Sequence, residues 1–385
     1  MTLPWTLECS ACLPTRSRGP DGLRGVCESC GAPYLVRYAA APTPEAKTLL
    51  QDREWTMWRY REWLPLAEGE SPVTLGEGGT PLLAAPRLGA RHGFENLWIK
   101  EEGTNPTGSF KARGLAAAVT RAVAAGARQF VIPTAGNAGV ALAAYSTRAG
   151  AQARVYAPAS TPATILAQIR SFGGDLVLLD GHIGDCGKAA RAFAADTGAV
   201  DVSTLREPYR IEGKKTLGLE LAEQLEWTLP DAIVYPTGGG TGLIGMWKAF
   251  QELRAGGWVR DALPRMYSVQ ATGCAPVIRA FESGADRCTP WPDPQTVAAG
   301  LRVPGPLGDR LMLRGLRESG GGAVAVTDDV LTAAAHEMQT VEGIDAAPEG
   351  GAALAGAVEL KRRGAIRRSE RVVVFNTGAG WLYRA

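Results

Sequence analysis

Short runs of β-branched and apolar residues alternate with longer helical stretches along most of this chain. The expected strands lie at 96–100, 129–134, 153–158, 175–180, 232–236, 266–271, 323–328 and 371–375. Helical stretches separate most of them, at 115–127, 136–150, 162–173, 185–198, 241–257, 274–284 and 330–343. Such alternation is typical of parallel sheets covered by helices, and 385 residues are enough for two domains, so we expect an α/β fold with two three-layer domains whose sheets are mainly parallel.

The first 40 residues have a different pattern. They contain four cysteines, together with several glycines and prolines, and show little helical period. We interpret residues 39–50 as a linker that leads into a short helix, and residues 68–93 as a turn-rich, extended stretch. We therefore expect a small, ribbon-like N-terminal segment ahead of the α/β domains.

Four loops that directly follow expected strands are rich in Gly, Thr and Asn. Their sequences are EEGTNPTGSFKARG (101–114), TAGNAG (134–139), TGGGTG (237–242) and NTGAG (376–380). In α/β folds ligands bind at the carboxyl ends of the strands. We therefore expect all four loops to open near the same edge of a sheet.

The loop from Thr237 to Gly242 has the plainest chemistry. A Gly-rich turn ahead of a helix presents several N–H groups and the positive end of the helix dipole, which suits a phosphate. The loop is not a Walker P-loop, because no Lys-Ser/Thr follows, and no acidic residue is placed to bind a ribose. Glycines that only allow close strand–helix packing are the alternative. The loop at 134–139 has the same form, with Asn137 as a fixed donor and acceptor, and could hold a carboxylate.

Lys111 stands at the start of a helix, behind the turn formed by residues 105–109. A lysine in the first turn of a helix is ordinarily solvated. Beside a phosphate-binding loop, however, a buried lysine with a lowered pKa is the usual group that forms a Schiff base. A phosphate-binding loop together with such a lysine points to pyridoxal phosphate as the cofactor.

The composition fits a soluble enzyme. The chain is 45% hydrophobic and 21% charged, with a net charge of +2. This balance argues against nucleic-acid binding through a basic surface, and no stretch of about 18 uncharged apolar residues predicts a membrane span. The N-terminus lacks the basic and apolar regions of a secretory signal. We therefore expect a cytoplasmic enzyme with neither a nucleic-acid nor a membrane partner.

The N-terminal cysteines form two knuckles, Cys9-x-x-Cys12 and Cys27-x-x-Cys30, separated by 14 residues. Each pair can bind one metal ion through two thiolates, and two pairs complete a tetrahedron. The spacing predicts a structural zinc ribbon; a ribbon without metal, or redox thiols, is the alternative. Because the segment has few aromatic residues and only modest basic charge, we interpret it as structural or as an interface element.

These motifs resemble those of fold-type II pyridoxal-phosphate enzymes, most closely the threonine synthase family. NPTGSFKARG resembles the family's lysine segment, TAGNAG its asparagine loop and PTGGGTGLIGMWKAF its phosphate loop, within a likeness that runs from residue 75 to 380. Many members also carry a four-cysteine head. The resemblance implies a ribbon-like segment at 1–40, a large cofactor-binding domain at 41–111 and 206–385, a smaller domain inserted at 112–205, and a homodimer.

The resemblance also implies roles for individual residues. Lys111 would form the Schiff base with the cofactor, Asn137 would hydrogen-bond its phenolic oxygen, and Thr377 would face its pyridine nitrogen. A neutral hydroxyl at that nitrogen makes the ring a weaker electron sink, which suits elimination and replacement. The cofactor phosphate would be bound by Gly238, Gly239, Gly240 and Thr241. The substrate carboxylate would be bound by the N–H groups of Thr134, Ala135, Gly136 and Asn137.

The implied reaction converts a small-molecule amino-acid substrate, O-phosphohomoserine, and water into threonine and phosphate. The amine of Lys111 would take the Cα proton and then shuttle the Cβ proton. Phosphate would leave from Cγ, and water would add at Cβ.

The chain departs from the family pattern at two positions that bear on the substrate. Ala112 stands where the lysine segment usually has an aspartate, and Glu207 stands where an asparagine helps to hold the substrate phosphate. A carboxylate a few ångströms from a phosphate is repulsive by about 1 to 4 kcal/mol unless it is paired. The basic residues that could pair it or bind the phosphate instead are Arg206, Arg210, Lys214 and Lys215. The alternative is that this stretch is a solvated charged loop.

Two other functions stay open. A threonine or serine ammonia-lyase uses the same lysine and cofactor contacts but needs no site for a substrate phosphate. A non-catalytic homologue would bind pyridoxal phosphate, or nothing, as a sensor or scaffold. The lysine at position 111 counts against this last interpretation.

Overall fold

The computed structural model describes residues 4–20 and 22–384 and divides into two compact units. The first unit comprises residues 1–79, 105–216 and 383–385, and the second comprises 80–104 and 217–382. The boundaries 41–111, 112–205 and 206–385 implied by the resemblance stay a prediction.

A four-stranded parallel sheet forms the centre of the first unit, in the order β8-β7-β6-β9. Its strands are β6 (Gln129–Pro133), β7 (Gln152–Pro158), β8 (Asp175–Leu179) and β9 (Val200–Asp201). The helices around it are α2 (Lys111–Ala124), α3 (Asn137–Arg148), α4 (Ala163–Ser171) and α5 (Ile183–Thr197). Tyr156 on β7 packs in a core with Cys186 of α5, whereas its neighbour Val155 lies against Gly139 of α3. Because successive strand residues point to opposite faces, α5 and α3 cover the two sides of this sheet.

The N-terminal segment of the first unit is a small antiparallel sheet in the order β2-β1-β3. Its strands are β1 (Trp5–Cys9), β2 (Ser17–Arg18) and β3 (Tyr34–Tyr38). Two 3-10 helices follow, η1 (Pro44–Leu50) and η2 (Met57–Trp63), and a third, η4 (Pro106–Gly108), precedes α2. The short helix expected from residues 39–50 is therefore confirmed, as the 3-10 helix η1.

A six-stranded sheet in the order β12-β11-β10-β13-β5-β4 forms the centre of the second unit. All neighbours are parallel except β4, which is antiparallel to β5. The strands are β4 (Leu82–Ala84), β5 (Asn96–Glu101), β10 (Ala232–Pro236), β11 (Arg265–Ala271), β12 (Gly322–Val326) and β13 (Arg371–Asn376). The helices are α1 (Pro86–His92), α7 (Thr241–Ala255), α8 (Pro276–Glu282), α9 (Asp309–Glu318), α10 (Asp328–Glu337) and α11 (Pro348–Arg362), with the short turns η3 (Glu102–Thr104), η5 (Ala299–Leu301), η6 (Met338–Glu342) and η7 (Gly380–Tyr383).

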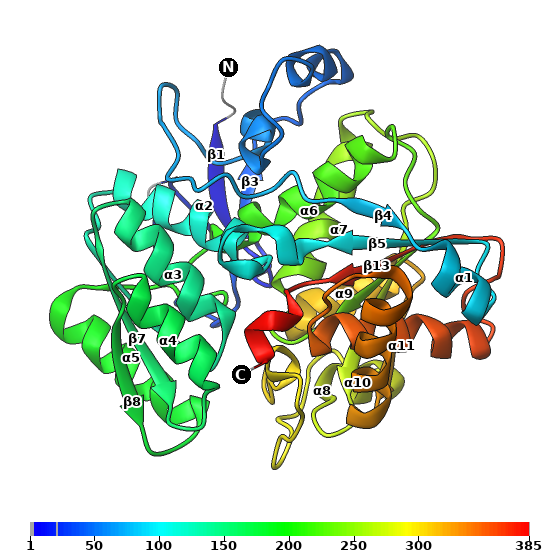
Figure 1. Ribbon diagram of the computed structural model, residues 1–385. Coiled ribbons are helices and arrows are strands. Elements are labelled where there is room, and N and C mark those ends of the chain that lie inside the picture. The colour runs from blue at the N-terminus through cyan, green and yellow to red at the C-terminus, as the bar shows by residue number, and fades with distance from the viewer. Residues whose placement is uncertain (1–3, 21, 385) are drawn as a thin grey trace. The chain divides into compact units, whose positions relative to one another are not determined.

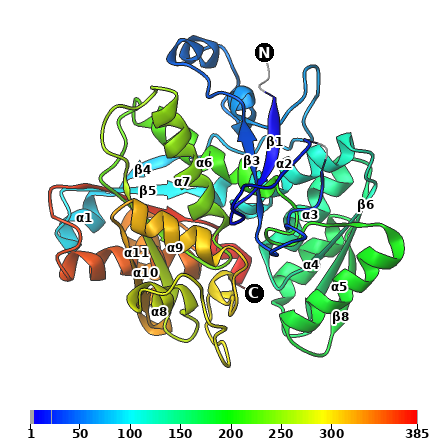
Figure 2. The same cartoon turned by 180° about the vertical axis from the view of Figure 1, so that it is seen from behind.

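Helices cover both faces of this six-stranded sheet. Val234 of β10 belongs to a buried core that includes residues of α10 and α11, which lie in front of the sheet in Figure 1. The next residue, Tyr235, points to the other face, where its hydroxyl approaches Gly242 of α7. Figure 2 shows α7 and α9 on this second side. The second unit is thus a three-layer α/β structure, as expected.

The alternating pattern predicted the strands correctly, but it did not show that the four loops belong to two different sheets. The strands β5, β10 and β13 are parallel neighbours in one sheet, so the loops that follow them begin at the same edge. The strand before the asparagine loop, β6, belongs to the other sheet. The expectation of one common edge for all four loops is therefore wrong, because the chain builds two separate parallel sheets.

Several helices have no counterpart in the sequence prediction. The main ones are α6 (Arg210–Gln224) and α9, together with the short α1. Helix α6 begins in the first unit and ends in the second. Within the described part of the chain, no helix has the length and apolar character needed to cross a membrane.

Candidate functional site

The glycine loop joins β10 to α7 in the second unit. Gly240 is in the left-handed region, with a φ of 81°, and caps the N-terminus of α7. A Cβ on Gly238 would collide with the carbonyl oxygen of Gly300, and one on Gly240 would collide with Met312. Among the described residues, the N–H groups of Gly238, Gly239, Gly240 and Thr241 have no hydrogen-bond partner. The loop therefore presents a row of backbone donors at the start of a 15-residue helix.

The loop around Thr377 directly follows β13, beside the end of β5. Asn376 is paired in register with Glu101, and its Nδ2 donates to both carboxylate oxygens at 3.0 and 2.8 Å. The Oδ1 of Asn376 accepts from the N–H of Ala347 at 3.3 Å, and that N–H also lies 3.0 Å from the carbonyl of Gly378. The side chain of buried Asn376, the residue before Thr377, is thus hydrogen-bonded to both β5 and the start of α11.

Glu101 is a buried carboxylate that sequence reasoning did not single out. Burial raises its pKa to about 7, although Asn376 and the N–H of Gly103 oppose the shift. The charges of Glu102 and Asp345 raise the pKa further. Ionisation of Glu101 is therefore coupled to the packing of the loop that carries Thr377.

This raised pKa predicts a pH-dependent contribution to stability. The folded protein binds a proton at Glu101 more tightly than the unfolded chain does, so the contribution is present below about pH 4.5 and is lost as the pH rises through about 7. As the pH rises through this range, we expect the free energy of unfolding of Glu101→Gln to increase by about 3 kcal/mol relative to that of the unchanged protein. Urea unfolding at a series of pH values measures it.

The control for this experiment is Glu68→Gln, which changes an exposed carboxylate in the same way. Its free energy of unfolding should keep a constant difference from that of the unchanged protein. A constant difference for Glu101→Gln as well would contradict the assigned burial of the charge.

The asparagine loop begins α3 in the first unit. The Oδ1 atom of Asn137 is buried and has no hydrogen-bond partner among the described residues, while its Nδ2 lies 3.5 Å from the hydroxyl of Tyr383. The N–H of Thr134 donates to Tyr156, and that of Gly136 donates to the Thr134 hydroxyl. Two of the four N–H groups expected to bind a carboxylate are therefore engaged inside the protein. Those of Ala135 and Asn137 are the donors left.

Lys111 is the first residue of α2 and is half-buried. Its Nζ lies 4.0 Å from the centre of the Phe110 ring, and the Nζ of Lys214 lies 3.9 Å from the same centre. Lys214 is fully buried and also donates to the Phe110 carbonyl. The turn before Lys111 includes Thr107 in the left-handed region, with a φ of 65°. Both predicted lysines therefore converge on Phe110.

Two adjacent residues, Glu77 and Gly78, contact the helix that begins at Asn137 and the turn before Lys111. The fully buried carboxylate of Glu77 accepts from the Trp58 indole at 2.5 Å, the N–H of Leu75 at 2.9 Å and the Tyr145 hydroxyl at 2.6 Å. Tyr145 lies on α3, which begins at Asn137. The next residue, Gly78, donates to the Asn105 side chain at 3.0 Å, at the start of the turn before Lys111. Sequence reasoning missed this role because a single Glu in a Gly-rich loop has no distinctive spacing.

The charged stretch from Arg206 to Lys215 is not a solvated loop. Arg210, Lys214 and Lys215 are buried at the start of α6, so the alternative interpretation of this stretch is wrong. Glu207 is also buried and accepts from the N–H groups of Tyr209, at 2.7 Å, and Arg210, at 3.0 Å. It is therefore a helix cap, which explains a carboxylate at this position.

Burial dominates the electrostatics of this segment. It raises the pKa of Glu207 to about 7, against the opposing charge of Arg210. Burial also lowers the pKa of Arg210. Arg210 donates from Nη1 to the Val202 carbonyl at 2.7 Å, whereas its buried Nε has no partner among the described residues. Lys215 forms an ion pair with Glu212 at 2.7 Å.

The four N-terminal cysteines lie together as expected. Their sulfur atoms all lie within 4.8 Å of one another, with separations of 3.5, 3.8 and 3.4 Å for three of the pairs. Zinc bound by four thiolates at about 2.3 Å places the sulfurs about 3.8 Å apart in a tetrahedron. All four thiols are free of disulfides. The arrangement fits one thiolate-bound metal ion.

Comparison with known proteins identifies the family. The family described as pyridoxal-phosphate dependent enzyme matches residues 73–378. A threonine synthase of Methanosarcina acetivorans is 35% identical over 97% of this chain and 91% of its own length. A threonine synthase of Methanocaldococcus jannaschii is 36% identical over 94% and 89%, and one of Mycobacterium leprae is 37% identical over 83% and 86%.

Solved structures support the same fold at lower sequence identity. Maize serine racemase superimposes with a TM-score of 0.69 at 23% identity, covering 78% of this chain and 88% of that one. A threonine deaminase from Solanum lycopersicum superimposes with a TM-score of 0.68 at 24% identity, covering 78% and 79%. From its motifs, its fold and these relatives, the chain belongs to the family of pyridoxal-phosphate dependent enzymes, in the fold-type II group that includes the threonine synthases.

Proposed function

We propose that this protein is a threonine synthase, a lyase that converts O-phosphohomoserine and water into threonine and phosphate. The observation that carries the proposal is the similarity to threonine synthases over nearly the whole chain, together with the buried basic residues at the start of α6. The similar region includes both the cofactor motifs and the segment expected to bind the substrate phosphate, so it supports the substrate as well as the cofactor.

The residues present fit pyridoxal phosphate. The N–H groups of Gly238, Gly239, Gly240 and Thr241 suit its phosphate, because they have no partner among the described residues and lie at a helix N-terminus. The buried Oδ1 of Asn137, likewise without a partner, suits a hydroxyl group on the ring. Lys111 would hold the cofactor covalently, and Thr377 would provide a neutral hydroxyl to the ring nitrogen. When bound, the cofactor supplies an electron sink that stabilises negative charge on the substrate's carbon.

We call the loop of Gly238, Gly239, Gly240 and Thr241 the glycine cradle. If it binds the cofactor phosphate, one added methyl group should strongly weaken cofactor binding. A Cβ on Gly238 meets the rigid carbonyl of Gly300, so the loop must move. We expect Gly238→Ala to weaken pyridoxal phosphate binding at least tenfold, about 1.4 kcal/mol, in an equilibrium titration of the cofactor. Gly305→Ala is the matched control, because its Cβ would have no neighbour within 4 Å. Equal cofactor affinity for the two variants would refute the cradle.

The chain's own residues supply the remaining chemistry. The amine of Lys111 would accept the proton from the substrate's Cα, transfer one proton from Cβ to Cγ, and finally return a proton to Cα. The N–H groups of Ala135 and Asn137 would bind the substrate carboxylate and hold the carbon skeleton in place. Phosphate would leave from Cγ, and water would add at Cβ.

The segment at the start of α6 would bind the substrate phosphate. Arg210 has a buried Nε without a partner among the described residues, and Lys214 is fully buried nearby in the sequence. Arg206 is the third expected contact. Because Glu207 is engaged in capping α6, its carboxylate has hydrogen bonds that offset part of the repulsion expected from the sequence.

A steady-state comparison of substrates tests the proposal. We expect phosphate release from O-phosphohomoserine to exceed by far the release of 2-oxobutyrate from threonine or pyruvate from serine. Dominant 2-oxobutyrate or pyruvate formation would instead establish the ammonia-lyase alternative. If no substrate turns over although the cofactor binds, the protein is a non-catalytic homologue.

We also infer a cytoplasmic homodimer. Homodimers are common among enzymes of this fold type, and seven cysteines without a disulfide suit a reducing compartment. Light scattering on the purified protein tests the oligomeric state.

A further inference from the structure

The ribbon formed by residues 5–38 is packed directly on the segment that leads into α6. Tyr209 is buried in the same core as Cys9, Cys27 and Tyr34, which are ribbon residues. Its hydroxyl also donates to the carbonyl of Pro20. The core of the ribbon is therefore completed by a residue more than 160 positions away, between Glu207 and Arg210.

A backbone contact joins the two segments more tightly. The N–H of Gly25 donates to the carbonyl of Arg206 at 2.7 Å, and the carbonyl of Gly25 accepts from the N–H of Tyr34 at 2.8 Å. A Cβ on Gly25 would lie 2.5 Å from the nitrogen of Glu207 and 2.6 Å from the carbonyl carbon of Arg206. Only a glycine permits this approach, because any side chain would force the two backbones apart.

A third contact reaches the first turns of α6. The hydroxyl of Tyr38, at the end of β3, donates to Glu212 at 2.8 Å. Glu212 forms its buried ion pair with Lys215, whose Nζ lies 4.3 Å from the centre of the Tyr38 ring. The ribbon thus contacts residues 206–212 at three points. Gly25 contacts Arg206, the ribbon core contains Tyr209, and Tyr38 bonds to Glu212 within α6.

From these contacts we infer that the four-cysteine ribbon positions residues 206–215, so that its metal-bound folded state sets the protein's affinity for the phosphate group of the substrate. The inference rests on the proposed function. A segment of about 35 residues buries too little apolar surface to fold alone and commonly depends on a metal. Because the ribbon's core includes Tyr209, metal binding and the shape of the anion-binding segment are linked in both directions.

The test uses two alanine variants of the full-length protein loaded with its cofactor. Gly25→Ala introduces the clash with residues 206 and 207 and leaves every cysteine in place. Gly19→Ala is the matched control, because its Cβ would have no neighbour within 4 Å in the same ribbon. Each variant is measured for zinc content, for hydrogen exchange of the amides at 203–216, and for binding of the phosphonate isostere of O-phosphohomoserine, whose carbon–phosphorus bond cannot be eliminated as phosphate.

We expect Gly25→Ala to weaken phosphonate binding about tenfold and to speed hydrogen exchange at 203–216, while cofactor content stays unchanged. Removal of zinc from the unchanged protein with a chelator should have the same two effects. Gly19→Ala should behave like the unchanged protein. Unaltered exchange and phosphonate affinity in both Gly25→Ala and the zinc-free protein would overturn the inference.

The proposed function and the positioning role of the ribbon can be disproved separately. If the unchanged protein does not bind the phosphonate, the proposed substrate is wrong. The exchange rates at 203–216 then still decide whether the ribbon positions this segment. Loss of cofactor from Gly25→Ala, with exchange at 203–216 unchanged, would also overturn the inference, because the ribbon would then act on another part of the protein.

Discussion

Lys111→Ala is expected to lose the visible absorbance of the bound cofactor and to lower kcat at least about 1,000-fold. The reason is that one amine both holds the cofactor and moves the protons at Cα and Cβ of the substrate. General acid–base catalysis by a positioned group contributes about 100- to 10,000-fold, and the covalent role adds to this. Absorbance spectra and single-turnover rates with O-phosphohomoserine measure the two losses.

Two further variants show whether the chemistry or the charge of Lys111 matters. Lys111→Arg keeps a cation at the start of α2, but a guanidinium stays protonated and cannot serve as a base. It should be as inactive as Lys111→Ala. Lys188→Ala, in an exposed ion pair with Asp185, should keep both absorbance and activity. Normal cofactor absorbance and turnover in Lys111→Ala would show that another lysine performs the reaction.

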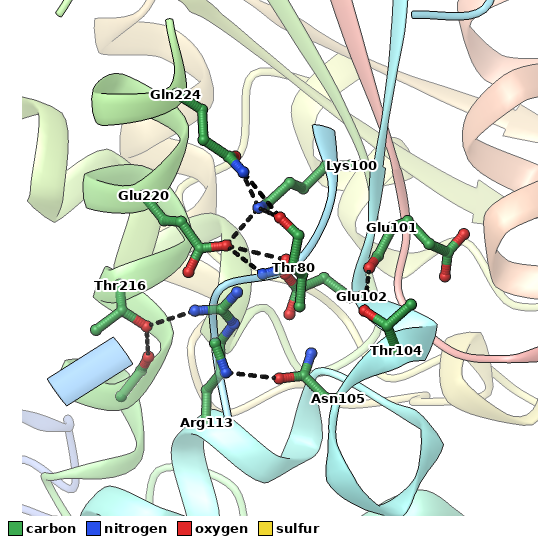
Figure 3. A network of polar contacts seen from close by, with 12 residues as sticks. Thr80, Lys100, Glu101, Glu102, Thr104, Asn105, Arg113, Thr216, Glu220 and Gln224 are labelled. Carbon is green, nitrogen blue, oxygen red and sulfur yellow. Dashed lines mark hydrogen bonds and ion pairs between the residues drawn. The ribbon is translucent and has the colours of Figure 1, made fainter. Parts of the chain in front are cut away.

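Lys100→Met is expected to lower the free energy of unfolding by about 3 to 5 kcal/mol, because it leaves a buried carboxylate without its cation. In Figure 3 the Nζ of Lys100 lies between Thr80, Glu220 and Gln224. It donates to the Thr80 carbonyl at 2.7 Å, to Glu220 at 2.5 Å and to Gln224 at 2.9 Å. Glu220 also accepts from the N–H of Thr80 at 2.8 Å.

Urea unfolding of single and double variants checks this account of the network. The double variant Lys100→Met with Glu220→Gln should recover much of the loss, because no unpaired charge is left buried. Lys188→Met, the same substitution in an exposed pair, should cost less than about 1 kcal/mol. If the double variant is as unstable as the sum of the single variants, the two residues are not energetically coupled.

Much of the fold follows from local patterns. The expected strands at 96–100, 232–236 and 371–375 occur as β5, β10 and β13, and each is followed by one of the expected loops. The reason is that buried parallel strands appear as short apolar runs and need Gly-rich turns at their ends. The cysteine knuckles were equally clear, because their spacing suits a single metal ion.

The burial of residues by partners that are distant in the chain could not be predicted from the sequence. The stretch from Arg206 to Lys215 has the composition of a solvated loop, yet it is buried by the ribbon, which packs on Tyr209, and by other distant partners such as Phe110, which contacts Lys214. Glu207 raised doubt as a charge near a phosphate, yet it caps α6. The role of Glu77 depends on Trp58 and Tyr145, which lie far from it in the chain. Such partners are set by tertiary packing and have no fixed spacing.

One isotope experiment tests the central claim, that the protein makes threonine by replacing phosphate with water. O-phosphohomoserine is converted in ¹⁸O-labelled water, and the products are analysed by mass spectrometry. We predict equal amounts of threonine and phosphate, with the label in the threonine hydroxyl and none in the phosphate, because the Cγ–oxygen bond breaks and water adds at Cβ. Label in the phosphate with homoserine as the organic product, or 2-oxobutyrate in place of threonine, would contradict the account.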